Sequence, residues 1–334
     1  MLKTVLIRLL SMIITLIGVA IVVFVLIRVA PGNPIAMMLS PGATEADIAA
    51  LKAHYGLDKS LFEQFFIWAG GVLQGDFGTS ITLKRPVLDL VLSRLPATLE
   101  LSLLALIIAL IIGGFTAIWG AKGRDRSSEA AVDLFNSAAL SIPDFLWGLL
   151  LILLFGVLWP IFAISGRISP SLNLGFSTQF LLIEAIFRLR FDVLRDLLAH
   201  MLMPALALAL PLAAVISQLL KQGLKDVLQL DYTVLARVKG FTETQVILRE
   251  GLRNAALPTL TLIGVQFTFL VGGTVIIERM FAYEGLGNMA IDAVINRDLP
   301  LIQGIVLMFS CLFIVINLSV DIAYTFLNPR LRHA

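Results

Sequence analysis

The chain has 334 residues, of which 58% are hydrophobic and 14% are charged, and its formal net charge is +2. A soluble domain is nearer half apolar and a quarter charged, so this composition predicts a membrane protein with several spans. The small net charge argues against nucleic-acid binding. The single cysteine, Cys311, excludes an internal disulfide, and the three histidines lie too far apart to offer metal-ligand spacing.

Long apolar stretches between ionisable residues predict the membrane spans. A span needs roughly 20 mostly apolar residues to cross a hydrocarbon core about 30 Å thick. Six stretches meet this requirement: Leu9–Ile27, Leu101–Ala121, Phe145–Gly166, Met201–Leu220, Asn254–Ile277 and Leu299–Val320. For the third span, Leu134–Leu158 is an equally good alternative, and it would place Pro143 and Asp144 inside the membrane. No small-residue cleavage site follows the first stretch, so we interpret residues 1–28 as an uncleaved anchor helix.

Residues 29–95, between the first two spans, predict a small extracytoplasmic segment of short helices. A helix is expected to start near Thr44 and stop at Gly56. The sequence from Ser60 to Glu63 has capping-box spacing, which favours a second helix reaching about Leu73. Turns are expected at residues 31–34 and 75–78, where Gly, Pro, Asn and Asp gather.

Basic residues near the span ends indicate the orientation. Under the positive-inside rule, short loops rich in Lys and Arg lie in the cytoplasm. Such residues occur at both termini and after the second and fourth spans: Lys3, Arg8, Lys122, Arg124, Arg126, Lys221, Lys225, Arg237, Lys239, Arg249, Arg253, Arg330 and Arg332. The arginines of loop 167–195, which lies on the expected extracytoplasmic side, argue for the opposite orientation. We expect both termini in the cytoplasm.

The stretch from Asp231 to Pro258 is a polar island of mixed charge between two apolar runs. Asp231 is suited to cap a short helix that Gly240 ends. Thr242 begins a capping box that predicts a second short helix, and Pro258 is suited to open the next element. Two short helices that meet at a glycine predict a rigid protrusion for docking a soluble partner. The alternative is an ordinary solvated loop.

Polar and small residues in the spans are candidates for a translocation path. Asp144, Gln266 and Thr268 are the candidates. The competing explanation for Gln266 and Thr268 is a hydrogen bond that holds helices together, and for Asp144 it is an interfacial or helix-capping carboxylate. Glycines at 113–114, 264 and 272–273 favour close helix packing. Carboxylates near span ends are interpreted as interfacial or helix-capping groups: Glu100, Glu278 and Asp321.

Several catalytic and nucleotide-binding motifs are absent from the sequence. There is no G-x-x-x-x-G-K-[ST] phosphate loop, no H-E-x-x-H and no G-x-S-x-G. We therefore expect no enzyme active site, no metal site and no cofactor on this chain.

The island resembles the EAA loop of ATP-binding cassette (ABC) importer permeases, in the branch that carries dipeptides, oligopeptides and nickel. Residues 231–240 match the pattern D-Y-x-x-x-A-[RK]-x-K-G, and residues 252–258 match L-R-N-A-x-L-P. Further family patterns follow in order over nearly the whole chain, at residues 28–34, 75–80, 94–100, 141–145, 285–287, 297–298 and 317–330. The chain departs from the family at Val234, Glu250 and Asn328, where many members carry Arg, His and Asp.

The resemblance implies an all-α membrane protein with the type I ABC importer permease fold. Six transmembrane helices are expected, divided as an anchor (1–28), an extracytoplasmic helical segment (29–95) and a permease domain (96–327) with coupling loop 231–258. The implied partners are a second homologous permease, two ABC ATPase subunits that hold ATP and Mg, and an extracytoplasmic solute-binding protein. The implied location is the bacterial cytoplasmic (inner) membrane, with lipid around the spans.

The implied function is import of di- or oligopeptides by alternating access, driven by ATP hydrolysis on the partner subunits. The residues expected to couple the permease to the ATPase are Tyr232, Ala236, Arg237, Lys239, Gly240 and Glu243. Nickel, glutathione, opines and other small solutes stay open as substrates. An ion-coupled secondary transporter and a scaffold subunit are the alternatives from other classes.

Overall fold

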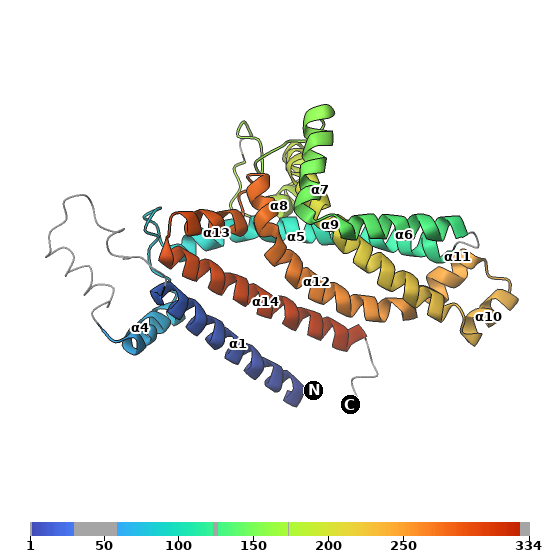
Figure 1. The fold of residues 1–334 in the computed structure, drawn as a ribbon, viewed down its shortest axis with the longest axis horizontal. Coiled ribbons are helices and arrows are strands. Elements are labelled where there is room, and N and C mark those ends of the chain that lie inside the picture. The colour runs from blue at the N-terminus through green and yellow to red at the C-terminus, as the bar shows by residue number, and fades with distance from the viewer. Residues whose placement is uncertain (1, 30–58, 123–125, 173, 328–334) are drawn as a thin grey trace. The chain divides into compact units, whose positions relative to one another are not determined.

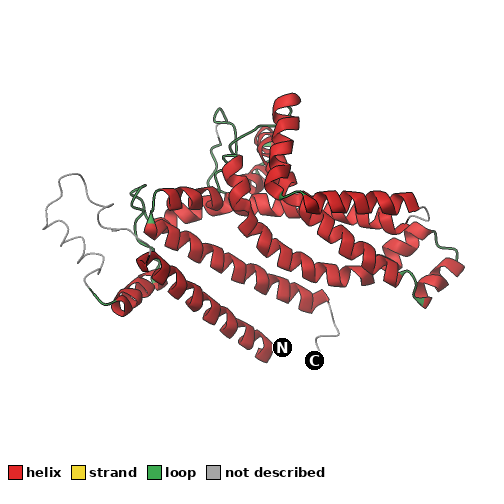
Figure 2. Cartoon of the chain, in the orientation of Figure 1, coloured by secondary structure: helices red, strands yellow, loops and turns green. Residues whose placement is uncertain are grey.

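The computed structural model describes residues 2–29, 59–122, 126–172 and 174–327, and within these ranges the chain folds into helices joined by loops (Figures 1 and 2). The expected helix between Thr44 and Gly56 and the turn at residues 31–34 lie outside the described residues. The chain divides into two compact units, Met1–Leu95 with Met289–Ile314, and Pro96–Asn288 with Val315–Ala334.

The first unit contains α1 (Leu2–Val29), α4 (Leu61–Leu73) and parts of three helices that continue into the second unit. Ser60 and Glu63 form the expected capping box at the start of α4. Gly75 and Gly78 both have positive φ, at 86° and 79°, so the expected turn is present there. Asp298 accepts hydrogen bonds from the Ser80 hydroxyl and the Thr82 N–H, which fixes the chain just after this turn.

The second unit is a helical bundle. Its helices, including those shared with the first unit, are α5 (Val87–Lys122), α6 (Arg126–Ser141), α7 (Asp144–Leu151), α8 (Leu181–Phe187), α9 (Phe191–Val227), α10 (Asp231–Val238), α11 (Glu243–Gln245), α12 (Leu252–Met280), α13 (Leu286–Ile295) and α14 (Leu299–Leu327). Two π-helical segments, Ile152–Leu158 and Val246–Gly251, extend α7 and join α11 to α12.

Helix α9 is the centre of this bundle. It packs against α6, α7, α8 and α12. Two-thirds of its most apolar stretch is buried (67%), against 33% for α5 and 29% for α12. A helix that is apolar all round needs helices on every side, whereas a helix apolar toward lipid does not. The protein interior therefore surrounds α9, while α5 and α12 leave apolar surface for lipid or partner helices.

Four helices are long and apolar enough to cross a membrane: α5, α9, residues 258–280 of α12 and residues 299–320 of α14. The α6–α7 pair, bent by 101°, would be a fifth if it counts as one broken span. Within α1, the described apolar segment Leu10–Val25 is shorter. The described part of the chain thus supports four or five spans, and six remains a prediction.

The expected boundaries of the third span, Phe145–Gly166, are wrong. The helix before the bend ends at Ser141, a second begins at Asp144, and regular helix ends at Leu158. Pro143 lacks an N–H and disfavours a helical conformation at the residue before it, so the chain breaks at residues 142–143. The alternative window, Leu134–Leu158, fits better, and it places the break and Asp144 within the apolar stretch.

Gly113, one of the glycines predicted to favour close packing, determines how closely α5 approaches α9. A Cβ on Gly113 would lie 2.6 Å from the carbonyl oxygen of Ala213 and 3.0 Å from the Ile216 side chain, so only glycine lets α5 reach α9 at this point. Its neighbour Gly114 has no atom within 4 Å of its Cβ position. The sequence predicted close helix packing at both Gly113 and Gly114, and the structure shows it at Gly113 only.

Candidate functional site

The loop between α9 and α12 forms a short exposed helix, α10, that lies at the end of the bundle with α11 (Figure 1). Asp231 is the first residue of α10 rather than its cap, because Leu230 holds the cap position. Lys239 ends the helix, and Gly240 follows with a φ of 85°. The Gly240 N–H bonds to the Arg237 carbonyl and the Phe241 N–H to the Ala236 carbonyl, the pattern of a Schellman motif. Gly240 is therefore the break that the sequence predicts.

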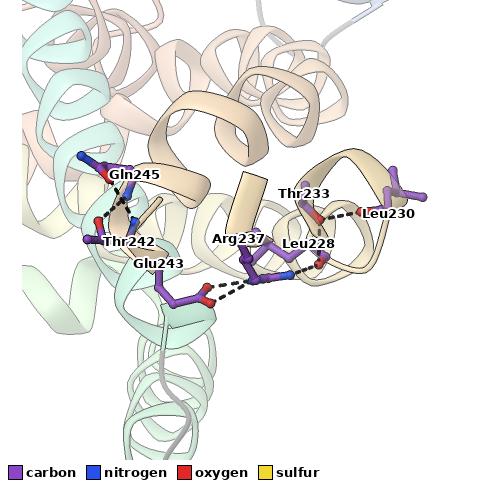
Figure 3. A network of polar contacts seen from close by, with 7 residues as sticks. All are labelled: Leu228, Leu230, Thr233, Arg237, Thr242, Glu243 and Gln245. Atoms are coloured by element: carbon purple, nitrogen blue, oxygen red, sulfur yellow. Dashed lines mark hydrogen bonds and ion pairs between the residues drawn. The ribbon is translucent and has the colours of Figure 1, made fainter. Parts of the chain in front are cut away.

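A polar network holds α10 in place (Figure 3). The Arg237 guanidinium donates to both carboxylate oxygens of Glu243, at 2.8 and 3.3 Å, and to the carbonyl of Leu228, at 3.1 Å. The Thr233 hydroxyl donates to the carbonyls of Leu228 and Leu230. These contacts join the end of α9, the helix α10 and the start of α11. The loop therefore has a defined conformation and is not an ordinary solvated loop.

The second predicted helix of the loop is present, but it is not separate. Thr242 and Gln245 form the expected capping box. Helical structure then continues through Val246–Gly251 directly into α12, so Pro258 lies inside α12 and does not open a new element. A force applied at α11 would therefore act directly on a membrane-spanning helix.

The predicted coupling residues fall into two groups. Tyr232, Lys239 and Gly240 are exposed, and Arg237 and Glu243 are about one-third exposed. Ala236 is buried, with 5% of its surface exposed, so it lies on the inner face of α10 and cannot contact another protein directly. The Tyr232 hydroxyl accepts a hydrogen bond from Asn254, at 2.8 Å, which ties α10 to α12.

Sequence reasoning missed an apolar surface on α10. Val234, Leu235 and Val238 are exposed to 47%, 53% and 79%, and together they form an apolar face on this short helix. The i, i+1, i+4 spacing of these residues gives a helix face, and that spacing was available in the sequence. Apolar surface of this kind, rimmed by polar groups, is typical of a protein–protein contact.

A cavity of about 260 Å³ lies between α7, α9 and α12. Two of the three predicted path residues, Asp144 and Gln266, line it. The third, Thr268, is buried and its hydroxyl donates to the Gly264 carbonyl one turn earlier, so it is not part of this cavity. Thr274 likewise bonds within α12, to the Val271 carbonyl.

Buried carboxylates hold the connections at the other end of the bundle. Glu100 receives the N–H groups of Leu182 and Ile183 at the start of α8, at 2.9 and 3.2 Å, and pairs with Arg167, at 2.8 Å. Glu278 receives the Thr98 hydroxyl and the Asn288 N–H in the first turn of α13. The expectation that they cap helices is confirmed: Glu100 binds the start of a helix distant in sequence, and Glu278 binds the start of the next helix along the chain. The Asp321 side chain lies outside the described residues.

Tyr283 lies beside this region and is fully buried. Burial raises the pKa of its hydroxyl above the ordinary value of 10.0, because the ionised form would lose its hydration. The group is therefore neutral at physiological pH. Among the described residues, no cluster of three or more His, Cys, Asp or Glu side chains could hold a metal ion.

Comparison with known proteins agrees with these features. Residues 109–333 match the family described as binding-protein-dependent transport system inner membrane component, and residues 1–102 match the N-terminal model of the same kind of protein. The glutathione transport system permease protein GsiC of Salmonella choleraesuis is 37% identical over 339 residues, with both chains fully covered. GsiC of Escherichia coli K12 is 36% identical, again over both whole chains.

Among solved structures, an amino acid ABC transporter crystallised with histidines covers 72% of this chain at 17% identity, with a TM-score of 0.47. The family matches together extend over nearly the entire sequence, and they include the coupling loop and the cavity residues. This chain belongs to the family of binding-protein-dependent transport system inner membrane components, and it is a permease subunit of an ABC importer.

Proposed function

We propose that this permease moves di- or oligopeptides, or the tripeptide glutathione, into the cell as one of two homologous permease subunits. The full-length similarity to glutathione permeases supports a small peptide-like solute, since those relatives are named for one. A solute-binding protein outside the membrane would deliver the substrate. Two ABC ATPase subunits, which carry ATP and Mg, would bind on the cytoplasmic side. Both termini of this chain would then lie in the cytoplasm of a bacterial cell with the permease in its inner membrane.

The exposed apolar face of α10, made of Val234, Leu235 and Val238, is the observation that carries the proposal for ATPase docking. An isolated chain that needed no partner would gain nothing by exposing three large apolar side chains on a polar loop. A groove in the ATPase can bury this face, and Tyr232 and Lys239 can supply polar contacts at its rim.

The mechanism follows from how α10 is held. The bond from Arg237 to the Leu228 carbonyl links α10 to the end of α9, and the bond from Asn254 to the Tyr232 hydroxyl links it to α12. ATP-driven closure of the ATPase pair would move α10, and these links would pass the movement to α9 and α12, two of the helices that line the cavity. Alternating access then requires that the outward-open and inward-open states bind the solute with different affinity.

The test is docking of the ATPase to a permease with a charged face. Val238→Asp places a carboxylate in the surface to be buried, and we expect about a tenfold or larger loss of co-purified ATPase and of ATP-driven uptake into proteoliposomes. Gln229→Asp is the matched control, because it adds the same charge at an exposed polar position of the same loop.

Equal recovery of the ATPase with Val238→Asp and with wild type would contradict docking through this face. Uptake that proceeds without ATP and follows an ion gradient would instead favour a secondary transporter.

A further inference from the structure

Asp144 sits at the bend of a broken helix, in the middle of the membrane-spanning part of the bundle. The segments Ser127–Ser141 and Asp144–Leu158 meet at 101°, and Asp144 is the first residue of the second. The cavity it lines is also lined by residues 208–215 of α9 and residues 266–273 of α12. These positions lie roughly 10 Å from each end of the apolar part of α12, at 1.5 Å per residue.

The carboxylate of Asp144 has one oxygen engaged and one directed to open space. Oδ1 accepts the N–H of Phe145, at 2.8 Å, in the first turn of α7. No described residue donates a hydrogen bond to Oδ2. Gly273 of α12 faces Oδ2, and a Cβ on that glycine would lie 4.0 Å from it. The absence of a side chain at residue 273 leaves room for a bound group next to the free oxygen.

The cavity contains no positive side chain to neutralise Asp144. Its lining is apolar apart from Asp144 and Gln266, and no Lys, Arg or His is among the lining residues. The start of α7 contributes a partial positive charge of about half a unit, which offsets only part of the carboxylate's full negative charge. An ionised Asp144 would give the cavity a negative potential, at a depth where an ionised group is costly and, by default, functional.

Capping alone does not account for this residue. Ser, Thr or Asn would receive a backbone N–H equally well without placing a charge at mid-membrane. A broken helix with a polar site at its break is also the arrangement by which membrane transporters commonly form a solute site near the midplane.

We propose that Asp144 is a specificity residue that binds a primary ammonium group of the solute as it crosses the membrane. This inference rests on the proposed function, in which the solute is a small peptide with a free amino terminus. At about 260 Å³ the cavity is smaller than a typical ligand pocket, so it accommodates one end of a peptide rather than the whole. Gln266, the other polar lining residue, supplies an amide carbonyl that can accept a second hydrogen bond from the ammonium.

The first test measures the charge of the cavity and does not depend on transport. A Gln266→Cys variant in a Cys311→Ser background places a single thiol of this chain in the cavity of the assembled importer. A cationic trimethylammonium-ethyl and an anionic sulfonatoethyl methanethiosulfonate compete for this thiol, each forming a mixed disulfide and releasing methanesulfinate. We expect Asp144→Asn to lower the cationic-to-anionic rate ratio about tenfold or more, whereas Asp292→Asn, at an exposed site, leaves it unchanged. An unchanged ratio in Asp144→Asn would overturn the inference.

The second test measures the uptake rate in proteoliposomes with the binding protein and ATPases, using alanyl-alanine and glutathione as probes that carry a primary ammonium group. Asp144→Asn and Asp144→Ser keep an oxygen for the Phe145 N–H but remove the charge. We expect both to reduce the maximal uptake rate about tenfold while the half-saturating concentration, set by the binding protein, stays the same. Asp144→Glu should retain most of the rate. Uptake by Asp144→Asn at the wild-type rate would overturn the role of Asp144, and absence of ATP-driven uptake by wild type would instead overturn the proposed function.

Discussion

Two ion pairs in the same bundle show how differently this chain uses charge. The side chains of Arg167 and Glu100 are 6% and 2% exposed, and Glu100 also receives two backbone N–H groups of α8. Those of Arg237 and Glu243 are 34% and 38% exposed, on the loop that we propose docks the ATPase. A buried charge that loses its partner is strongly destabilising, whereas an exposed pair contributes little. The first pair therefore fixes the fold, and the second shapes a surface that can yield to a partner.

The largest expected effect comes from breaking the buried pair. Glu100→Ala leaves the Arg167 guanidinium buried without its carboxylate and uncaps the start of α8, so we expect the free energy of unfolding to fall by about 3–5 kcal/mol. Thermal unfolding of the purified protein in detergent measures this. The double variant Glu100→Ala/Arg167→Leu should recover part of the loss. If Glu100→Ala alone were as stable as wild type, the buried pair would stabilise the fold no more than the exposed pair does.

A smaller effect is expected where α5 and α9 approach most closely. Gly113→Ala forces the new methyl group toward the Ala213 carbonyl, so we expect a loss of about 1–3 kcal/mol. Gly114→Ala is the matched control, because its Cβ position is open, and it should change stability by less than about 0.5 kcal/mol. Equal effects at the two positions would show that this contact does not hold the bundle's interior.

At the exposed loop, function should change more than stability. Gly240→Pro cannot adopt the positive φ of 85°, so we expect a local loss of about 1 kcal/mol, normal membrane insertion and little ATP-driven uptake. Gly240→Asn should retain uptake, since Asn accepts this backbone conformation. Uptake and ATPase activity in proteoliposomes are the measurements. Full uptake by Gly240→Pro would show that α10 needs no fixed bend.

The smallest effect concerns pH and the loop before α8. The Thr178 hydroxyl and the N–H groups of Ser177 and Thr178 bind the Glu184 carboxylate and lower its pKa from 4.5 to about 2. The folded state thus favours the ionised form. The resulting stabilisation is complete above about pH 4.5 and is lost as the pH falls toward 2.

Glu184→Gln should remove this part of the acid dependence. Stability measured from pH 6 to pH 3 would fall less steeply in the variant than in wild type. Parallel pH profiles would contradict the assignment.

Several features of this protein follow from the sequence alone. Apolar runs of span length predict α5, α9, α12 and α14, because a helix that crosses lipid needs such a run wherever it packs. Local capping chemistry predicts the start of α4 at Ser60, the capping box at Thr242 and the break at Gly240, since each depends on residues within a few positions of one another. The order of the motifs predicts the family.

Other features depend on residues far apart in the chain, and only the tertiary structure decides them. Helix propensity cannot tell that Ala236 is buried while Val238 is 79% exposed, because the packing of α10 against the segment Val246–Gly251 sets the difference. Asp144 and Gln266 line one cavity because α7 packs against α12, and these two helices are far apart in the chain. Gly113 and Gly114 are identical in sequence terms, yet only one of them faces α9.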